Sequence, residues 1–220
     1  MNPPLPPIAE TGLRFFGAVT ASASHELKNH LAIINENAGL LDDLAQMAGR
    51  GRAIDPNRLL KLAADLIAQV RRADATIGAM NRFAHSVDRT IDALDLNALL
   101  DLMARLAQRL MAMRKVRLIP PPPQPSVQVH ASAYFLMNLI WRVLDATARE
   151  SEIRMTVESA PDGARIHLDY SDIALDAETV ERLGEENSVL SDIVNAESAY
   201  DPTNRRLSLT IRNAPSPDTR

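Results

Sequence analysis

The sequence predicts an α+β protein in which a long N-terminal helical hairpin forms a dimeric four-helix bundle and the C-terminal part forms an α/β sandwich. Apolar residues recur at alternating steps of three and four over residues 27–48 and again over residues 59–84, which is the pattern of helices with one buried side. Beyond residue 115, short segments in which apolar and polar residues alternate indicate strands. Together these patterns predict two domains.

The overall composition excludes several classes of function. A net charge of −4 and a pI near 5.7 offer no basic face for nucleic acid. The absence of cysteine excludes disulfides, thiol catalysis and cysteine-ligated metal centres. No run approaches the roughly 18 apolar residues of a membrane-spanning helix, and the start of the chain lacks the pattern of a signal peptide. We therefore expect a cytoplasmic protein with neither a nucleic-acid nor a membrane partner.

Proline and glycine mark the limits of the N-terminal hairpin. Four prolines near the start predict a disordered lead-in over residues 1–10. The first helix is expected over residues 8–48, because the Gly-Arg-Gly-Arg sequence at residues 49–52 stops it. Asp55 then offers an N-cap and Pro56 a first helical residue for the second helix. The expected buried seam comprises Leu27, Leu31, Ile34, Ala38, Leu41, Ala45 and Ala48 of the first helix and Leu59, Ala63, Leu66, Val70, Ala73, Ile77, Met80 and Ala84 of the second.

Two helices joined by a short turn cannot enclose an apolar stripe from all sides. Pairing of two hairpins into a four-helix bundle buries the stripe, so we expect a homodimer through residues 11–90. The alternative is that the hairpin packs against the rest of its own chain.

The predicted C-terminal domain covers residues 91–214 and begins with a helix. The Asp-Leu-Asn sequence at residues 95–97 has the character of a helix start, and apolar residues follow on one face as far as Met113. Short extended segments are expected at residues 116–118 and 127–129, on either side of a proline-rich connection.

The remaining elements predict helices on one face of a small sheet. An apolar helix is expected over residues 131–150, followed by alternating strands at residues 153–157 and 166–170. The Pro-Asp-Gly sequence between these two strands predicts a β-hairpin. Further along the chain we expect short helices over residues 176–184 and 188–196, a last strand over residues 207–211 and a polar tail over residues 215–220.

His25 is the candidate for chemistry in the hairpin. It projects about 160° away from Leu27 on the first helix, so the imidazole should face solvent, and Asn29 lies one turn further on the same side. A neutral imidazole is a good nucleophile for phosphorus near pH 7 and forms a high-energy phosphoramidate. The alternative is a solvated surface histidine with no chemical role.

The sequence Ser-His-Glu-Leu-Lys-Asn at residues 24–29 resembles the phosphoacceptor motif of bacterial histidine kinases, and the hairpin resembles their dimerisation and phosphotransfer domain. Residues 95–97 resemble the linker into the ATP-binding domain of these kinases, and Asn138 lies where that domain has its asparagine-bearing helix. The resemblance extends over about residues 22–211. It implies a degenerate kinase-ATPase-like sandwich for the C-terminal domain.

The resemblance also implies roles for three residues of the motif. His25 is the phosphoacceptor, Glu26 orients it and accepts its proton, and Asn29 orients a water molecule or supports phosphatase action. The family often has proline five residues after the histidine, where this chain has His30.

A zinc site is an alternative interpretation of the same stretch, because His-Glu-x-x-His is a metalloprotease signature. Here Asn29 occupies the position of the second histidine. His30 lies about 140° around the helix from His25 and cannot share a metal ion with it. We therefore expect no metal ion bound by this chain.

The nucleotide site of the kinase family is expected to be lost. Active kinases carry a second asparagine four residues after the first, where this chain has Arg142 after Asn138. They also have an aspartate followed by glycines after the second strand, whereas residues 169–173 contain no glycine. A loop that cradles phosphate needs backbone conformations that glycine supplies most readily. We expect no ATP or other cofactor on this chain.

A phosphoacceptor hairpin joined to such a domain resembles the dimeric histidine phosphotransferases of bacterial phosphorelays. The predicted function is transfer of a phosphoryl group through His25 between the aspartates of two response regulators, without use of ATP. The predicted partners are response-regulator receiver domains, which would supply the magnesium ion, and Ser22 and Lys28 are expected to contact them.

Two alternatives remain open from the sequence. A divergent histidine kinase would phosphorylate His25 from ATP bound to its own chain. A dimeric scaffold would dock a regulator without phosphate chemistry.

Overall fold

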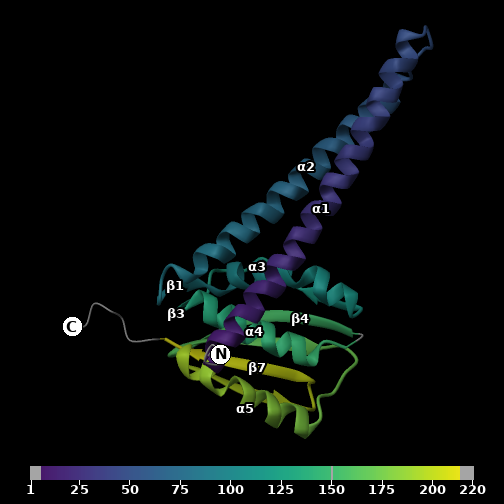
Figure 1. Cartoon of the computed structure of the whole chain (residues 1–220). Coiled ribbons are helices and arrows are strands. Elements are labelled where there is room, and N and C mark those ends of the chain that lie inside the picture. Colours follow the sequence, from purple (N-terminus) through teal and green to yellow (C-terminus); the bar gives the residue numbers. More distant parts are fainter. Residues whose placement is uncertain (1–5, 150, 214–220) are drawn as a thin grey trace, which may run out of the picture. The chain divides into compact units, whose positions relative to one another are not determined.

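The structure, a computed structural model, describes residues 6–149 and 151–213 (Figure 1). The helices are α1 (Pro7–Gly49), α2 (Pro56–Ala84), the short 3-10 helix η1 (His85–Val87), α3 (Leu96–Met113), α4 (Ala133–Thr147) and α5 (Ala177–Ile193). The strands are β1 (Asp92–Asp95), β2 (Val116–Ile119), β3 (Gln128–Ala131), β4 (Ser151–Ala160), β5 (Gly163–Tyr170), β6 (Ala196–Asp201) and β7 (Arg206–Arg212). Helices thus fill the N-terminal part and a sheet organises the C-terminal part, as the α+β prediction requires.

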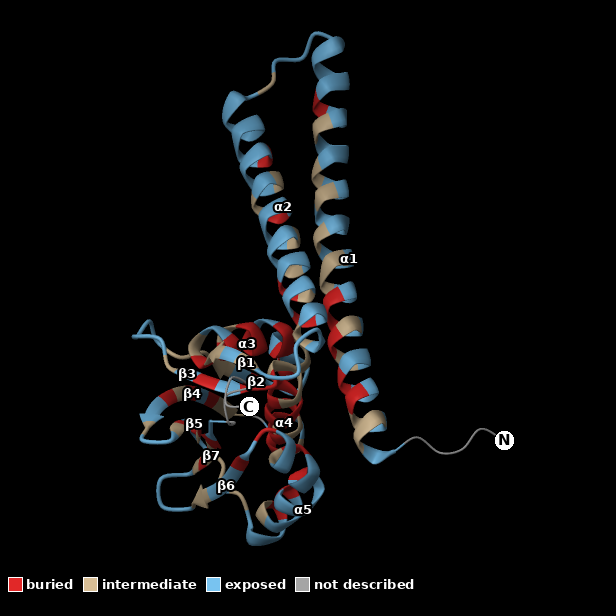
Figure 2. Cartoon of the chain, turned by 90° about the vertical axis from the view of Figure 1, so that its left-hand side faces the viewer, coloured by how far each residue is buried: buried red, intermediate tan, exposed pale blue. Residues whose placement is uncertain are grey.

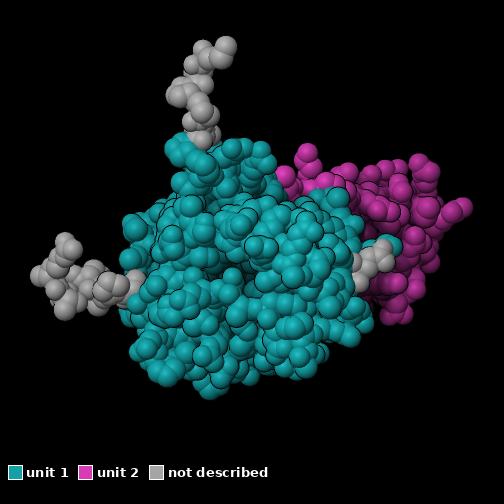
Figure 3. Space-filling view, turned by 90° about the horizontal axis from the view of Figure 1, so that it is seen from below, with its two compact units in different colours: residues 1–19, 82–220 teal, residues 20–81 magenta. Residues whose placement is uncertain are grey.

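The chain divides into two compact units (Figure 3). Thr20–Asn81 form one, which we call the hairpin unit, and Met1–Val19 with Arg82–Arg220 form the other, which we call the sheet unit. The predicted domain boundary at residue 90 differs from this division, because the start of α1 and the end of α2 pack with the C-terminal elements.

The ends of α1 and α2 follow local sequence signals. Gly51 adopts a positive φ of 80°, a left-handed conformation that glycine adopts readily. The Asp55 carboxylate then accepts a hydrogen bond from the Asn57 backbone N–H at 2.9 Å, which confirms the predicted N-cap.

The predicted lead-in over residues 1–10 is wrong for its last part, because α1 begins at Pro7. Proline suits a first helical turn, since the turn needs no hydrogen bond from its nitrogen. The rest of the lead-in, at residues 1–5, and the tail predicted over residues 215–220 lie outside the described residues.

Figure 2 shows most of the hairpin unit as exposed or half-buried in the single chain. No residue of the predicted apolar seam is buried there: the half-buried ones are Leu27, Ile34, Leu41, Leu66, Ala73 and Met80, and the others are exposed. The buried side chains of this unit lie at positions outside the predicted seam, so its register is wrong: they are Ser22, Ala23 and Leu44 of α1 and Leu62, Gln69 and Ala79 of α2. Part of the predicted seam stays exposed, because a helix in a two-helix hairpin contacts one neighbour and leaves its flank open. We call these exposed positions the open apolar face: Leu31, Ala38 and Ala45 of α1 and Leu59, Ala63, Val70 and Ile77 of α2.

In the sheet unit, five strands form a sheet in the order β2-β4-β5-β7-β6, and β1 pairs with β3 in a separate two-stranded ribbon. β2 and β4 are parallel and the other neighbours are antiparallel. Alternate residues such as Ile153, Met155 and Leu168 are fully buried, and Figure 2 shows α4 and α5 along one side of the strands. This is the predicted two-layer arrangement.

The predicted β-hairpin is confirmed by the antiparallel pairing of β4 with β5, in which Val157 lies opposite Ile166. A side chain at Gly163 would clash with the carbonyl oxygen of Ile211 on β7, which explains glycine at the turn.

Two expectations for the C-terminal part are wrong. Residues 177–193 form one helix, α5, and Gly184 lies inside it instead of ending it. Buried Leu183 and Leu190 hold α5 on either side of this glycine, which outweighs its low helix propensity. β1 and β6 were not predicted. β1 depends on β3, which is distant in the sequence. β6 is an edge strand with a run of exposed residues and no alternation.

Aromatic side chains join the start of α1 to α4. The Phe15 ring lies 5.2 Å from Phe83, 5.7 Å from Tyr134 and 6.0 Å from Trp141, measured between ring centroids. The Tyr134 hydroxyl donates to the Gly12 carbonyl oxygen at 2.7 Å, and burial raises the pKa of this tyrosine. The first turns of α1 therefore belong to the core of the sheet unit.

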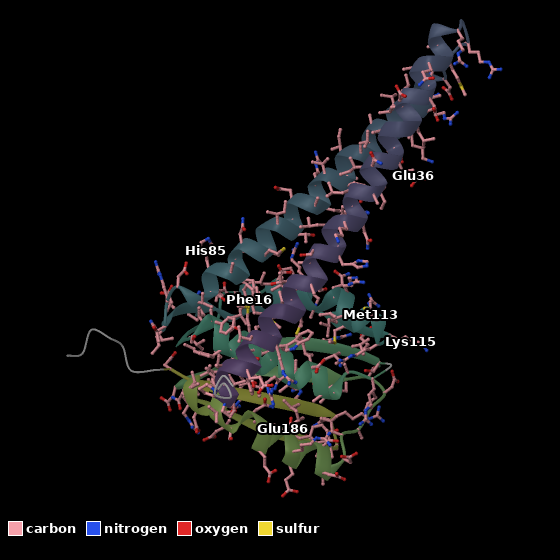
Figure 4. All side chains as sticks on the ribbon, in the orientation of Figure 1. Phe16, Glu36, His85, Met113, Lys115 and Glu186 are labelled. Carbon is pink, nitrogen blue, oxygen red and sulfur yellow. The ribbon has the colours of Figure 1, made fainter. Side chains whose placement is uncertain are left out.

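Phe15→Ala is expected to lower the free energy of unfolding by about 3–5 kcal/mol, because it leaves a large cavity in this cluster. Phe16→Ala is the comparison variant: Phe16 is 42% exposed (Figure 4) and its ring stacks on Phe83 at 5.5 Å, so it should cost about half as much as Phe15→Ala or less. Urea unfolding followed by circular dichroism measures both. Equal losses for the two variants would contradict the placement of Phe15 in the core.

No helix in the described part of the chain combines the length and apolar character needed to cross a membrane.

Candidate functional site

His25 lies in α1 within the hairpin unit, and its imidazole is exposed, as the helical periodicity predicts. Within the described residues it makes no hydrogen bond or ion pair. Lys28 and Asn29, one turn further along α1, are also exposed. The site therefore presents an unpartnered imidazole, a cation and an amide at the surface. An imidazole in this setting can attack phosphorus with a neutral nitrogen while its other nitrogen contacts water.

Ser22, predicted to contact a partner protein, is 3% exposed, so this assignment is wrong. Ser22 lies three residues before His25 on α1, so its side chain projects about 60° away from the imidazole, toward the covered side of the helix. Of the two predicted docking residues, Lys28 alone is accessible.

Glu26 does not turn toward His25. Its carboxylate oxygen Oε1 lies 3.9 Å from His30 Nε2, one helical turn further along α1. His30 Nδ1 in turn lies 3.0 Å from Gln69 Oε1 of α2. The carboxylate expected to accept a proton from His25 thus has a second histidine ring beside it, at a separation too long for a hydrogen bond.

The sequence interpretation missed Gln69. A signal was present, because Leu62, Leu66, Gln69 and Ala73 repeat at steps of three and four, and a glutamine in such a series is a polar residue facing another helix. His30 was identified only as a departure from the proline of the kinase family.

The zinc alternative finds no support in the arrangement of His25 and His30, since the second ring is bonded to Gln69. No group of three or more histidine, aspartate or glutamate side chains within residues 6–149 and 151–213 is arranged to hold a metal ion.

The residues implied to form a nucleotide site lie on α4 and in the segment after β5. Arg142, at the position of the second asparagine, donates to the Asn187 side-chain oxygen of α5 at 2.5 Å and to the Glu186 carbonyl oxygen at 3.1 Å (Glu186 is labelled in Figure 4). In the segment after β5, the Ser171 N–H donates to the Glu152 carbonyl oxygen and the Leu175 N–H to the Tyr200 hydroxyl. These two backbone N–H groups are already bonded within the protein.

The space between α4, α5 and the sheet does not fit a nucleotide. The cavity there measures about 20 Å³, which is room for roughly one water molecule. Its walls include Leu139 and Val143 of α4, Leu183 and Asn187 of α5, and Leu209 of β7.

Asn138 is fully buried, and neither atom of its side-chain amide has a hydrogen-bond partner in the described part of the chain. It lies at the wall of a separate cavity of about 350 Å³ within the sheet unit, which Arg14, Arg114 and Arg142 also line. A buried amide without partners lowers stability, because it has lost its bonds to water.

Asn138→Leu is therefore expected to raise the free energy of unfolding by about 1–2 kcal/mol, since leucine has a similar shape and no polar atoms. Asn187→Leu is the matched control: Asn187 accepts from Arg142 and donates to the Leu183 carbonyl oxygen, so its loss should destabilise the protein. Urea unfolding compares the two variants. A loss of stability in Asn138→Leu would show that Asn138 has a partner, such as a bound water molecule.

No family model matches the chain, and no curated protein is similar to it in sequence. Among solved structures, the catalytic domain of the histidine kinase ThkA is similar to this chain. The match covers 58% of this chain and 100% of the ThkA domain, with 14% identity and a TM-score of 0.47. The histidine kinase AdeS of Acinetobacter baumannii is similar to 87% of this chain over 98% of its own, with 11% identity and a TM-score of 0.47. A bacterial phosphotransferase is also similar: the match covers 90% of this chain and 95% of the phosphotransferase chain, with 12% identity and a TM-score of 0.42. Similarities this low assign no activity to the chain.

Proposed function

We propose that the protein is a dimeric histidine phosphotransferase of a phosphorelay, in which His25 accepts a phosphoryl group from the aspartate of one response regulator and passes it to the aspartate of another. The observation that carries the proposal is the exposed and unpartnered imidazole of His25 within the sequence Ser-His-Glu-Leu-Lys-Asn. A phosphoacceptor must be reachable by a second protein, and His25 meets this requirement.

In the first step, a neutral nitrogen of His25 attacks the phosphorus of an aspartyl phosphate. The nitrogen–phosphorus bond forms, the oxygen–phosphorus bond breaks, and the regulator's carboxylate leaves. In the second step, the carboxylate of the other regulator attacks the phosphohistidine and the nitrogen leaves. Magnesium held by the regulator's own carboxylates would offset the charge of the phosphoryl oxygens.

The exposed side chains beside His25 are suited to such a partner. Lys28 places a positive charge one turn from the imidazole, where it can attract the acidic site of a regulator, and Asn29 offers an uncharged donor and acceptor.

The absence of ATP from the proposed reaction is supported by the sheet unit. The cavity between α4 and α5 measures only about 20 Å³, and Arg142 is bonded to α5, so the space between these two helices does not admit a nucleotide.

The proposed homodimer is supported by the open apolar face of the hairpin unit. Val70 is 55% exposed and Leu31 is 59% exposed in the single chain. A second copy of the hairpin would cover both in a four-helix bundle, and burial of apolar surface favours that assembly.

The experiment incubates the purified protein with a receiver domain carrying a radiolabelled aspartyl phosphate, and then with a second, unlabelled receiver domain. Label should appear on the protein and then on the second receiver without added nucleotide. A parallel reaction supplies labelled ATP and no receiver. Labelling from ATP alone would overturn the proposal in favour of a kinase, and docking of receivers without any labelling would favour a scaffold.

A further inference from the structure

The cavity of about 350 Å³ within the sheet unit has a basic lining. Its guanidinium groups come from three helices: Arg14 of α1, Arg114 of α3 and Arg142 of α4. One carboxylate, that of Asp145, lies in the same lining. Three cations against one anion leave an excess of two positive charges, which favours a ligand with two negative charges.

We propose that this cavity is a binding site for a small organic phosphate, whose phosphate group pairs with the arginines and whose apolar part packs against Phe15 and Trp141. Both aromatic side chains belong to the lining. A phosphate monoester carries nearly two negative charges above about pH 7, which matches the excess charge of the lining. The cavity also has the size of a small-molecule site, which is typically about 300–1,000 Å³. The inference goes beyond the proposed phosphotransfer and does not depend on it.

The proposed site is separate from the space between α4 and α5. No residue lines both this cavity and the cavity of about 20 Å³ found there. One wall of the larger cavity is the start of α1, which lies beside α4 (Figure 2), with the Phe15 and Trp141 ring centroids 6.0 Å apart. A ligand in this cavity would therefore contact α1, α3 and α4 together.

The arginines of the lining retain the capacity to bind an anion. Arg14 pairs with Glu10 at the surface, where the two side chains are 80% and 52% exposed, and exposed ion pairs of this kind contribute little stability. Arg142 bonds to α5 through Nε and Nη2, and its Nη1 forms no hydrogen bond with the described residues. Arg114 is held in place by Asp145, to which it donates at 2.6 Å. A phosphate group can accept two parallel bonds from one guanidinium, so it suits such a lining.

Asn138 adds a second observation. It belongs to the lining, it is fully buried, and neither atom of its amide has a partner in the described part of the chain. Buried side-chain amides nearly always have hydrogen-bond partners, so an unpartnered amide at a cavity wall indicates that a bound molecule completes its bonding. Both amide atoms are covered in the structure, so this contact requires a small shift of the neighbouring side chains.

The test uses Trp141 as its reporter, because it is the single tryptophan of the chain and lines the cavity. Phenyl phosphate is titrated into the full chain above about pH 7 while the tryptophan emission is followed, and a saturable change gives the dissociation constant. Phenol presents the same ring without the charge and should produce no saturable change. Inorganic phosphate should compete with phenyl phosphate but bind more weakly, because it lacks the apolar part.

Arg14→Gln is expected to raise the dissociation constant for phenyl phosphate about tenfold, because it removes one charge-assisted hydrogen bond. Arg105→Gln is the matched control. Arg105 forms the same kind of exposed ion pair, with Asp101 four residues earlier in its helix, but does not line the cavity. It should leave the dissociation constant unchanged, and equal effects of the two substitutions would overturn the inference.

Three further outcomes would overturn the inference. Phenol that binds as tightly as phenyl phosphate would show an apolar cavity without a role for the arginines. Binding of ATP that requires magnesium would show a kinase nucleotide site instead. A titration without a saturable change below about 10 mM phenyl phosphate would show no site. Urea unfolding gives a readout that does not depend on fluorescence: saturating phenyl phosphate should raise the unfolding midpoint, because the ligand binds the folded chain alone.

Discussion

His25→Ala is expected to abolish labelling of the protein by a phosphorylated receiver domain and to stop onward transfer to a second receiver. The substitution removes the nucleophile, and no other imidazole can take its place at this surface of α1, because His30 is bonded to Gln69 within the hairpin unit. The measurement is the amount of label on the protein after separation from the receiver, followed over time.

His85→Ala is the matched control for this experiment. His85 is an exposed histidine of the sheet unit, labelled in Figure 4, and its Nδ1 lies 2.7 Å from an Asp88 carboxylate oxygen. Its removal should leave labelling unchanged. Equal labelling of His25→Ala and the unaltered protein would rule out His25 as the phosphoacceptor and leave the scaffold alternative.

Substitution of both Val70 and Ile77 by aspartate is expected to convert a dimer into a monomer. These residues are seven apart on the open apolar face of α2, and they are 55% and 46% exposed in the single chain. Full burial of each side chain contributes about 1.5–3 kcal/mol, and buried aspartates without partners oppose association further. The dissociation constant should therefore rise at least about 100-fold, which corresponds to roughly 2.8 kcal/mol. Sedimentation equilibrium measures the change.

Ala75→Asp is the control, because Ala75 is also exposed but projects about 160° away from Ile77 on α2. It introduces the same charge outside the open apolar face and should leave the dimer intact. A dimer that survives the double substitution would show that the copies associate through another surface, and an unaltered protein that is monomeric would remove the homodimer from the proposal.

Local signals in the sequence were enough to place most helices and strands. Asp95 caps α3 by accepting from the Asn97 N–H at 2.9 Å, as residues 95–97 predict, because capping depends on a few adjacent residues. Alternation of apolar residues identified β4, β5 and β7 for a similar reason: each of these strands places one face against the core.

Elements that depend on distant partners were not predictable in this way. β1 is such an element, because it pairs with β3 and Asp92 lies opposite Ala131. β6 was missed for a different reason: it is an edge strand beside the adjacent β7, and its exposed residues Glu197, Ser198 and Ala199 show no alternation. The start of α1 joined the sheet unit through Phe15, whose ring partners lie more than 60 residues further along the chain. No short-range pattern identifies such contacts.

Helical periodicity is enough to predict that His25 faces outward, because the direction of a side chain on a helix follows from its position along the turn. The surroundings of His25 depend on the fold. Glu26 Oε1 lies 3.9 Å from His30 Nε2, and the other nitrogen of that ring bonds across the hairpin to Gln69, 39 residues away in the chain. Closure of the space beside α4 likewise required α5 to be placed, since Arg142 meets Asn187 only after the chain has folded.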